Sequence, residues 1–452
     1  MTIPQSKAGT GNANAINGTQ NSWNLWEKIL FRFFFVYLIL ETASSFWLGI
    51  LPNLNFILRP VQYLLDWAVN LANAKLFHIR PVLIPLAGSG DTSYGWAQQC
   101  LFLLLATVGC LFWSVLDRKR QNYRGLNYWL CTIVRYSLAG IAFFYGIMKM
   151  FGFQMGFPEE SFLATPLGDL LPMRFSWFFV GYSDAYQFFG GLLEVTVGAL
   201  LMFRRTVTLG VMLATGVFIN VMMLNLCYDI PVKIFSTNVV LFCLYLLANE
   251  AERIGRIFIL NKTASTSTLY TFPYSRKWMR VTKTILKTIF ILLAVVATLY
   301  SNGKYYLSMS KYSPKLVIPS GQYDVEKFAR NKDTILYSPT DSIRWRDIIF
   351  EKTGRWGSIG TTDTVFTQWY RRGYFIFKVD TNQQMLNFNK LPLEGPRNDA
   401  TILSLRYQFP DSNSIRLWGR QGNDSLFILL KKSNRHYQLA EKQFHWLSEY
   451  NR

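Results

Sequence analysis

The 452-residue chain is rich in apolar side chains: half of its residues are apolar, 16% are aromatic and 16% are charged. These proportions are typical of an integral membrane protein and argue against an ordinary soluble enzyme. The net charge is +20, but Lys and Arg gather in short segments beside long apolar runs. We therefore attribute the basic character to membrane orientation, and we expect no nucleic-acid binding.

Cysteine and histidine usage speaks against a redox or metal centre within the chain. The five cysteines lie in or beside apolar segments, and none forms a CxxC pair, so a thiol–disulfide enzyme is not expected. The three histidines, His78, His436 and His445, are scattered without metal-ligand spacing, so we expect no zinc or haem site. Any electron transfer would then need a partner protein.

The chain begins with a polar stretch and continues into apolar runs. Residues 1–28 are predicted to form a disordered cytoplasmic tail, because their first part is small and polar and lacks apolar periodicity. Crossing a bilayer takes about 20 apolar residues in a helix. Seven segments have that length, near 29–51, 97–116, 127–151, 185–203, 206–226, 232–249 and 283–301.

The loops between these segments predict an orientation. The basic loops 117–124, 204–205 and 250–282 fall on one side of the seven-span arrangement, and Lys and Arg are retained in the cytoplasm. The N-terminus is therefore expected on the cytoplasmic side of a bacterial inner membrane and the C-terminus in the periplasm. The outer loop 52–96 contains VQYLLDWAVNLANAKLF, which predicts an interfacial or re-entrant helix. It ends in AGSGDTSYGW, either a surface turn or a cap over an outer cavity.

After Tyr300 the composition becomes that of a soluble domain. Strand-length segments alternate or run apolar, and they are separated by turn formers such as DSNS, QGND and EGPRND. The segments are DSIRWRDIIF, RGYFIFKV, ATILSLRYQF, SIRLWGR and DSLFILLKK. We expect residues 302–452 to form a periplasmic antiparallel domain of eight to ten short strands, a small barrel or a sandwich. Its basic residues form either a solvated face or a ligand-binding surface.

Charged residues inside the apolar segments are the candidate site residues, because a charge at the bilayer centre costs a few kcal/mol. At a rise of 1.5 Å per residue, Arg135 and Glu194 lie about 12 and 13 Å from the inner ends of their helices. They are expected at the same level, where an ion pair between adjacent helices would satisfy both charges without any chemistry.

A second group of polar residues is expected near the outer surface. Lys149 lies at the outer end of the third segment, where it is either an interfacial anchor or, in an apolar pocket, a catalytic base or anion-binding group. The residues expected at about its level are Glu41, Asn220, Asn225, Tyr228, Asp229 and Lys233. Together they would line an outer-facing polar cavity.

The third to sixth apolar segments resemble the DoxX-like superfamily of four-helix membrane proteins. The resemblance rests on VRYSLAGIAFFYGIMKMF, with Arg135, Gly146 and Lys149 at that family's R, G and K positions. It continues through FFGGLLEVTVGALLMFRR, which contains Glu194, and NLCYDIPVKIFSTNVVLFCLYLL. The resemblance implies a four-helix core over 127–249, preceded by an extra membrane region over 29–126.

This resemblance implies a quinone-linked role, because DoxX-like proteins include the membrane subunit of thiosulfate:quinone oxidoreductase. A more distant likeness joins the segment around Lys149 to the membrane domain of vitamin-K-dependent carboxylases, in which a lysine acts as a base. GFQMGFPEESF follows Lys149 here, without the acidic and tryptophan pattern of the carboxylases. The carboxylase activity is therefore not transferred.

Three functions remain open at this point, and the sequence does not establish whether the chain is an enzyme. The first is the membrane component of a quinone-linked redox system, whose periplasmic domain docks a partner protein. The second is a non-enzymatic envelope scaffold or assembly factor with structural intramembrane charges. The third is a small-solute or lipid transporter, although no inverted repeat is evident.

Overall fold

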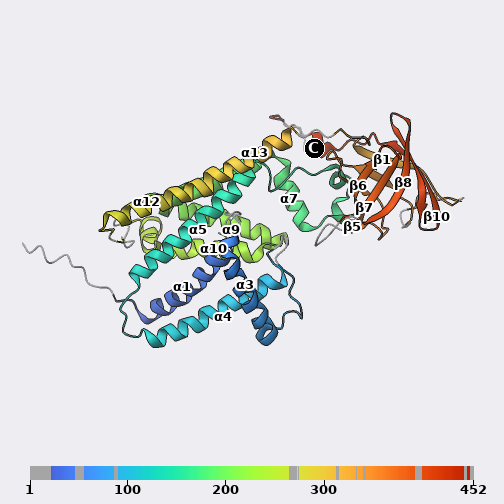
Figure 1. Cartoon of the computed structure of the whole chain (residues 1–452). Helices are drawn as coiled ribbons and strands as arrows, with labels where there is room; N and C mark the ends of the chain where they lie inside the picture. Colours follow the sequence, from blue (N-terminus) through green and yellow to red (C-terminus); the bar gives the residue numbers. More distant parts are fainter. Residues whose placement is uncertain are drawn as a thin grey trace, which may run out of the picture. The chain divides into compact units, whose positions relative to one another are not determined.

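The computed structural model of the chain is shown in Figure 1. It describes residues 22–45, 55–85, 90–263, 272, 274–311, 315–331, 333–338, 343–391, 400–441 and 445–447. The expected disordered tail therefore lies mainly outside the described residues, but its last part does not, because the first helix already begins at Leu25. The chain divides into two compact units: Met1–Ile141 with Val197–Phe218 and Ile234–Leu293, and Ala142–Thr196 with Ile219–Lys233 and Ala294–Arg452.

The first unit is helical. It contains α1 (Leu25–Ser45), α3 (Asn55–Ala72) with η2 (Asn73–Phe77), α4 (Ser93–Leu116), most of α10 (Lys233–Ala248), α11 (Ala251–Ile254), η4 (Gly255–Ile259) and α12 (Lys277–Ile291). Three further helices contribute residues to both units: α5 (Arg124–Met150), α8 (Asp184–Met202) and α9 (Val207–Cys227). The prediction of long apolar helices in this part of the chain is confirmed.

Five described helices are long and apolar enough to cross a membrane: α4, α5, α8, α9 and the continuous helix over 277–310. A sixth candidate is α10 taken with α11 and η4, a pair bent by 71°. The first predicted span, near 29–51, forms α1 up to Ser45. It meets the length but not the composition, since it carries Glu27, Lys28, Arg32 and Glu41. Seven spans therefore stay a prediction.

The segment between α1 and α4, which is expected on the outer side, is helical over Asn55–Phe77. Residues of VQYLLDWAVNLANAKLF form α3 and η2, which agrees with the expected helix, and Val69 and Ala72 pack against Ala97 and Leu101 of α4. In AGSGDTSYGW the structure does not describe residues 87–89, and the remainder is no simple turn. Thr92 caps α4 by accepting a hydrogen bond from the Gly95 amide, so the helix begins at Ser93, earlier than expected.

The helix at the last predicted membrane segment is longer than the predicted 283–301. Helices α12, η5 (Leu292–Ala297) and α13 (Thr298–Ser310) form a continuous 34-residue helix. At 1.5 Å per residue it is about 51 Å long, whereas the hydrocarbon core of a bilayer is about 30 Å thick. The helix therefore extends well past any one crossing, and the C-terminal domain begins after Ser310 and not at residue 302.

The second unit contains a closed β-barrel, shown in orange and red in Figure 1. Its ten strands are β1 (Gly321–Arg330), β2 (Asp333–Thr334), β3 (Asp347–Phe350), β4 (Trp356–Ile359), β5 (Thr367–Trp369), β6 (Arg372–Asp380), β7 (Met385–Lys390), β8 (Thr401–Asp411), β9 (Ser414–Gln421) and β10 (Asp424–Lys432). The antiparallel order β1-β3-β4-β6-β7-β8-β9-β10 returns to β1, and β2 and β5 pair at its margin. A short helix, η6 (Gln438–Glu441), follows.

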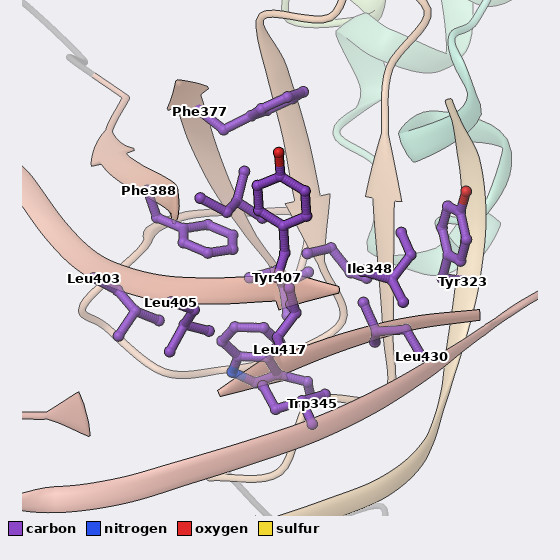
Figure 2. Packing of buried hydrophobic residues seen from close by; sticks show 14 of the residues in the cluster. Tyr323, Trp345, Ile348, Phe377, Phe388, Leu403, Leu405, Tyr407, Leu417 and Leu430 are labelled. Atoms are coloured by element: carbon purple, nitrogen blue, oxygen red, sulfur yellow. The ribbon is translucent and has the colours of Figure 1, made fainter. Parts of the chain in front are cut away.

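Alternating apolar residues of the strands fill the barrel, as Figure 2 shows. In β10, Leu426, Ile428 and Leu430 are buried at every second position, which is the period of a strand with one inward face. Trp345, which is 2% exposed, packs between Phe328 and Phe388. The alternatives of barrel and sandwich are thus decided in favour of the barrel, within the expected number of strands.

Candidate functional site

A buried ion pair joins two helices in the second unit. Lys149 is the residue before the last of α5, and its ammonium group contacts the carboxylate Oε1 of Glu194, in the middle of α8. The two side chains are 12% and 2% exposed. A charge buried this deeply destabilises the fold when its partner is absent, so each residue offsets the desolvation cost of the other.

Two glycines bring α5 and α8 close together beside this pair. A Cβ atom added to Gly191 would lie 2.5 Å from the carbonyl oxygen of Gly146 and 3.0 Å from the Lys149 Cβ. A Cβ atom added to Gly146 would meet the Gly191 carbonyl at 2.8 Å. Only residues without a side chain allow backbones to approach in this way. The two glycines therefore bring Lys149 and Glu194 within reach of each other.

The ion pair leaves hydrogen-bonding capacity unused. Glu194 Oε2 is buried and, among the described residues, has no hydrogen-bond partner. An ammonium group has three donors, and Glu194 Oε1 takes up one direction of Lys149. Tyr145, one helical turn before Lys149, interacts electrostatically with Glu194. The arrangement can therefore present a donor and an acceptor to a polar group entering the apolar surroundings.

The structure corrects the predicted pairing of Glu194 with Arg135. Lys149 follows Arg135 by 14 positions on α5, or about 21 Å along the helix axis, so a carboxylate paired with Lys149 is beyond the reach of Arg135. The guanidinium of Arg135 instead lies over the ring of Tyr136, 5.2 Å from its centre. The predicted pairing compared the distance of each residue from the end of its own helix. It left out how far α5 and α8 are shifted along each other, and the contact of Gly146 with Gly191 sets that shift.

Glu41, expected near Lys149, has a different set of partners in the first unit. Gln99 Nε2 donates to Glu41 Oε1 at 2.8 Å and to the Tyr37 hydroxyl at 2.5 Å. The Tyr37 hydroxyl donates to Asn238 Oδ1 at 2.7 Å, and Asn238 Nδ2 donates to Gln99 Oε1 at 3.0 Å. This network of α1, α4 and α10 was not anticipated, because an isolated Gln or Asn in an apolar segment does not reveal its partner.

The remaining predicted residues lie on α9 and the turn that follows it. Asn220 is exposed, whereas Asn225 is buried. Asp229 adopts a positive φ of 51° and pairs with Lys233 at 2.7 Å, as a local turn would require. The prediction that these residues share a cavity with Lys149 stays a prediction.

A polar network within the second unit connects the segment between α5 and α8 to the barrel. That segment contains α6 (Glu160–Leu163), η3 (Leu167–Asp169) and α7 (Pro172–Tyr182). The amide and hydroxyl of Ser161 both donate to Glu351 Oε1, at 2.8 and 2.5 Å. Ser358 of β4 donates to the Ser161 hydroxyl at 2.8 Å. We call Ser161, Glu351, Ser358, Arg372 and Asp347 the clamp.

The clamp ends in a second buried ion pair. Arg372 Nε donates to the Ser358 hydroxyl at 3.0 Å, and Arg372 Nη2 contacts Asp347 Oδ1. Arg372 is 1% exposed, and Arg346 also contacts Asp347, at 2.8 Å. Burial alone would raise the pKa of Asp347, but the positive charges of Arg372 and Arg346 outweigh it and lower the pKa. The carboxylate is therefore held ionised inside the domain.

Further contacts support the clamp along the same segment. Arg174 of α7 donates to the Tyr370 hydroxyl at 3.0 Å, and Asp169 pairs with Arg371 at 3.2 Å (Figure 1 shows α7 beside β5 and β6). Sequence reasoning missed all of these residues. The sequence predicts that the basic residues of this domain form either a solvated face or a ligand-binding surface, and no local pattern shows that residues 161, 351 and 372 meet.

An acidic residue beside the clamp titrates near neutrality. Glu159 is exposed by its surface area, but the protein atoms packed around its carboxyl group and the negative charge of Glu351 raise its pKa to about 7. The same two causes raise the pKa of Glu160, against the opposing charges of Lys352 and Lys432. In the described part of the chain, no cluster of three His, Cys, Asp or Glu residues is placed to hold a metal ion.

Comparison with known proteins gives one informative relative. The chain is 33% identical over 125 residues to the uncharacterized protein YwoB of Bacillus subtilis (strain 168). The match covers 27% of this chain and 79% of that protein. The chain belongs to the YwoB family. No protein-family model matches the chain, and no solved structure matches it significantly. YwoB is itself uncharacterized, so function has to be argued from the residues.

Proposed function

We propose that the chain is a DoxX-like integral membrane protein that serves as the membrane component of a quinone-linked redox system. The observation that carries the proposal is the buried Lys149 and Glu194 pair with its unpartnered acceptor, Glu194 Oε2. A quinone is a flat apolar ring with carbonyl oxygens, and its reduced form carries hydroxyl groups instead. An ammonium donor in apolar surroundings fits the carbonyl oxygens, and a carboxylate acceptor fits the hydroxyl groups. The bound quinone would supply the redox chemistry.

The protein's own residues would position the ring and move protons. Lys149 would donate a hydrogen bond to a carbonyl oxygen, and Glu194 would accept one from a ring hydroxyl. Gly146 and Gly191 hold α5 and α8 at the separation that keeps the ion pair intact when the site is empty. The electrons would come from a partner protein, since the sequence offers no redox group for them.

The proposed location is a bacterial inner membrane with a cytoplasmic N-terminus and a periplasmic barrel. The alternation of basic loops supports this orientation. The clamp supports a role for the barrel in docking, because it connects the barrel to the segment that directly joins the two helices of the ion pair. A protein bound to the barrel would then be linked by a short path to Lys149 and Glu194.

The test is to purify the full chain gently from its native membrane and identify co-eluting lipids and proteins by mass spectrometry. Wild type, Lys149→Ala and Lys304→Ala are compared, the last as a matched exposed lysine on α13. We expect a stoichiometric quinone with wild type and Lys304→Ala, and its loss with Lys149→Ala. Equal amounts of protein without quinone in every sample would contradict the proposal.

The alternative is an envelope scaffold or assembly factor, and the clamp is the observation that favours it. A network of buried hydrogen bonds from Ser161 to Asp347 specifies a rigid arrangement, which is what a scaffold needs. In that case Lys149→Ala should lower the amount of protein in the membrane. Partners that co-elute with the barrel should be the same for wild type and for the surviving variant.

A further inference from the structure

The first unit contains a group of basic residues that the proposed function does not use. On α12 and its N-cap residue, cations recur at i, i+4, i+7 and i+11, which places them on one face of the helix. They are Arg276, Arg280, Lys283 and Lys287. The opposite face exposes apolar side chains, namely Trp278, Val281, Ile285, Leu286 and Ile289. One face of α12 is thus suited to anions and the other to acyl chains.

Two of these lysines contact aromatic residues of the same unit. The Lys287 ammonium lies over the ring of Phe203, 4.1 Å from its centre, and that of Lys283 lies over Tyr274 at 4.7 Å. The hydroxyl of Tyr274 is 2.8 Å from that of Tyr128 on α5. Phenol groups therefore lie beside the Lys283 ammonium group and could donate hydrogen bonds to the same anion.

Arg135 completes this cationic niche, which we define as Arg135, Lys283, Lys287, Tyr128 and Tyr274. Its positive charge acts on Lys287, together with that of Lys283, and also on Tyr274. Arg135 Nε is buried and lacks a hydrogen-bond partner among the described residues. Within the described part of the chain, none of the three cations forms an ion pair with a carboxylate.

An acidic residue of the same unit, Glu250, has partners outside the niche. Glu250 interacts electrostatically with Cys131, which lies one turn before Arg135 on α5. Its Oε2 accepts a hydrogen bond from Thr208 at 3.3 Å and pairs with Arg253 at 3.5 Å. Three like charges held together repel one another, and the repulsion is relieved when an anion binds among them.

We propose that the cationic niche binds the phosphate group of an anionic phospholipid. Basic pockets between membrane helices on the cytoplasmic side are suited to phospholipid headgroups. The apolar outer face of α12 would contact the acyl chains of the same leaflet, which a free phosphate ion cannot do. The buried, unsatisfied Nε of Arg135 supplies a directed donor for a phosphate oxygen.

The test measures lipid retention by the delipidated full chain in neutral detergent. Native mass spectrometry is recorded after addition of phosphatidylglycerol or phosphatidylcholine, and thermal unfolding is followed with the same lipids and with inorganic phosphate at matched ionic strength. Lys283→Gln/Lys287→Gln is compared with Lys262→Gln/Lys277→Gln, which removes the same charge from exposed positions. Arg135→Gln is measured alongside.

We expect wild type and the control to retain phosphatidylglycerol in preference to phosphatidylcholine. The Lys283/Lys287 variant should bind it at least tenfold more weakly, given about 1 kcal/mol for each basic residue near an anionic headgroup. Equal binding by that variant and the control would overturn the proposal. Stabilisation by inorganic phosphate without any by phosphatidylglycerol would overturn the lipid assignment.

The proposal can still be tested if the Lys283→Gln/Lys287→Gln variant misfolds, because the headgroup preference is measured on the wild-type protein alone. A wild-type protein that binds both lipids equally contradicts a phosphate niche with net positive charge. The charge-preserving Lys283→Arg/Lys287→Arg variant, checked by circular dichroism, should restore retention. Loss of retention in that folded variant would show that charge at these positions is not what binds the lipid.

Discussion

The second unit buries charge in two places, and the two differ in how many partners each charged group has. In the clamp, Asp347 is contacted by two arginines, and Arg372 and Ser161 have further donors and acceptors around them. Between α5 and α8, Lys149 and Glu194 have each other, and Glu194 Oε2 is left open. Arg372 Nη1 also lacks a hydrogen-bond partner among the described residues. A network in which each charge has several partners holds a structure together, whereas an open acceptor beside a single cation is where a ligand can bind.

The largest expected effect follows from breaking the clamp at Asp347. Asp347→Ala leaves the buried guanidinium of Arg372 without its carboxylate, which should cost about 3–5 kcal/mol of unfolding free energy. The measurement is denaturant unfolding of the full chain in detergent, followed by tryptophan fluorescence from the barrel. Asp424→Ala is the control, because Asp424 pairs with Arg330 at the surface, where both side chains are 33% exposed. An Asp347 variant as stable as that control would contradict a structural role.

The next effect concerns the approach of α5 and α8. Gly191→Ala puts a Cβ 2.5 Å from the Gly146 carbonyl oxygen, so the helices must separate, at a cost of about 1–3 kcal/mol. Gly190→Ala is the matched control, since nothing lies within 4 Å of its added Cβ. Thermal unfolding in detergent compares the two. Equal melting temperatures would mean that close contact does not hold the Lys149 and Glu194 pair.

Ser161→Ala should weaken the connection between the barrel and the segment that joins α5 to α8. It removes the donor to Glu351 Oε1 and the acceptor of Ser358, which should cost about 1–3 kcal/mol because a buried carboxylate loses a partner. Limited proteolysis within residues 152–183 should become faster. Ser183→Ala, at a hydrogen bond near the surface, should leave the cleavage rate unchanged.

The smallest expected effect is a pH dependence near neutrality. The pKa of Glu159 is about 7 in the folded state, above its ordinary value of 4.5 in the unfolded chain. Between these two pH values the folded state keeps a proton that the unfolded state has released. Stability should therefore fall as pH rises from about 5 through 7. Glu159→Gln should flatten the profile, whereas Glu326→Gln, at an exposed pair with Lys431, should not. An identical slope in both variants would remove Glu159 as the cause.

Much of the fold could be predicted from local pattern. Long apolar runs predicted the helices, and alternating segments predicted β6, β8, β9 and β10 at nearly their observed bounds, whereas the segment that contains β3 was predicted six residues too long at its start. Thr92 shows the limit of this reasoning, since its capping hydrogen bond begins α4 inside a cluster of turn formers. Charge placement predicted Lys149 and Glu194 as candidates, but not as partners of each other.

By itself the sequence determined the long helices, several of the strands and which charges lie in apolar segments, because period and composition act over a few residues. Only the tertiary structure decided the partners. The pairing of Glu194 with Lys149 depends on the offset that Gly146 and Gly191 allow between α5 and α8. The contact of Ser161 with Glu351 joins residues 190 positions apart. Such contacts are set by packing and by the requirement that buried polar atoms find partners, which no local pattern records.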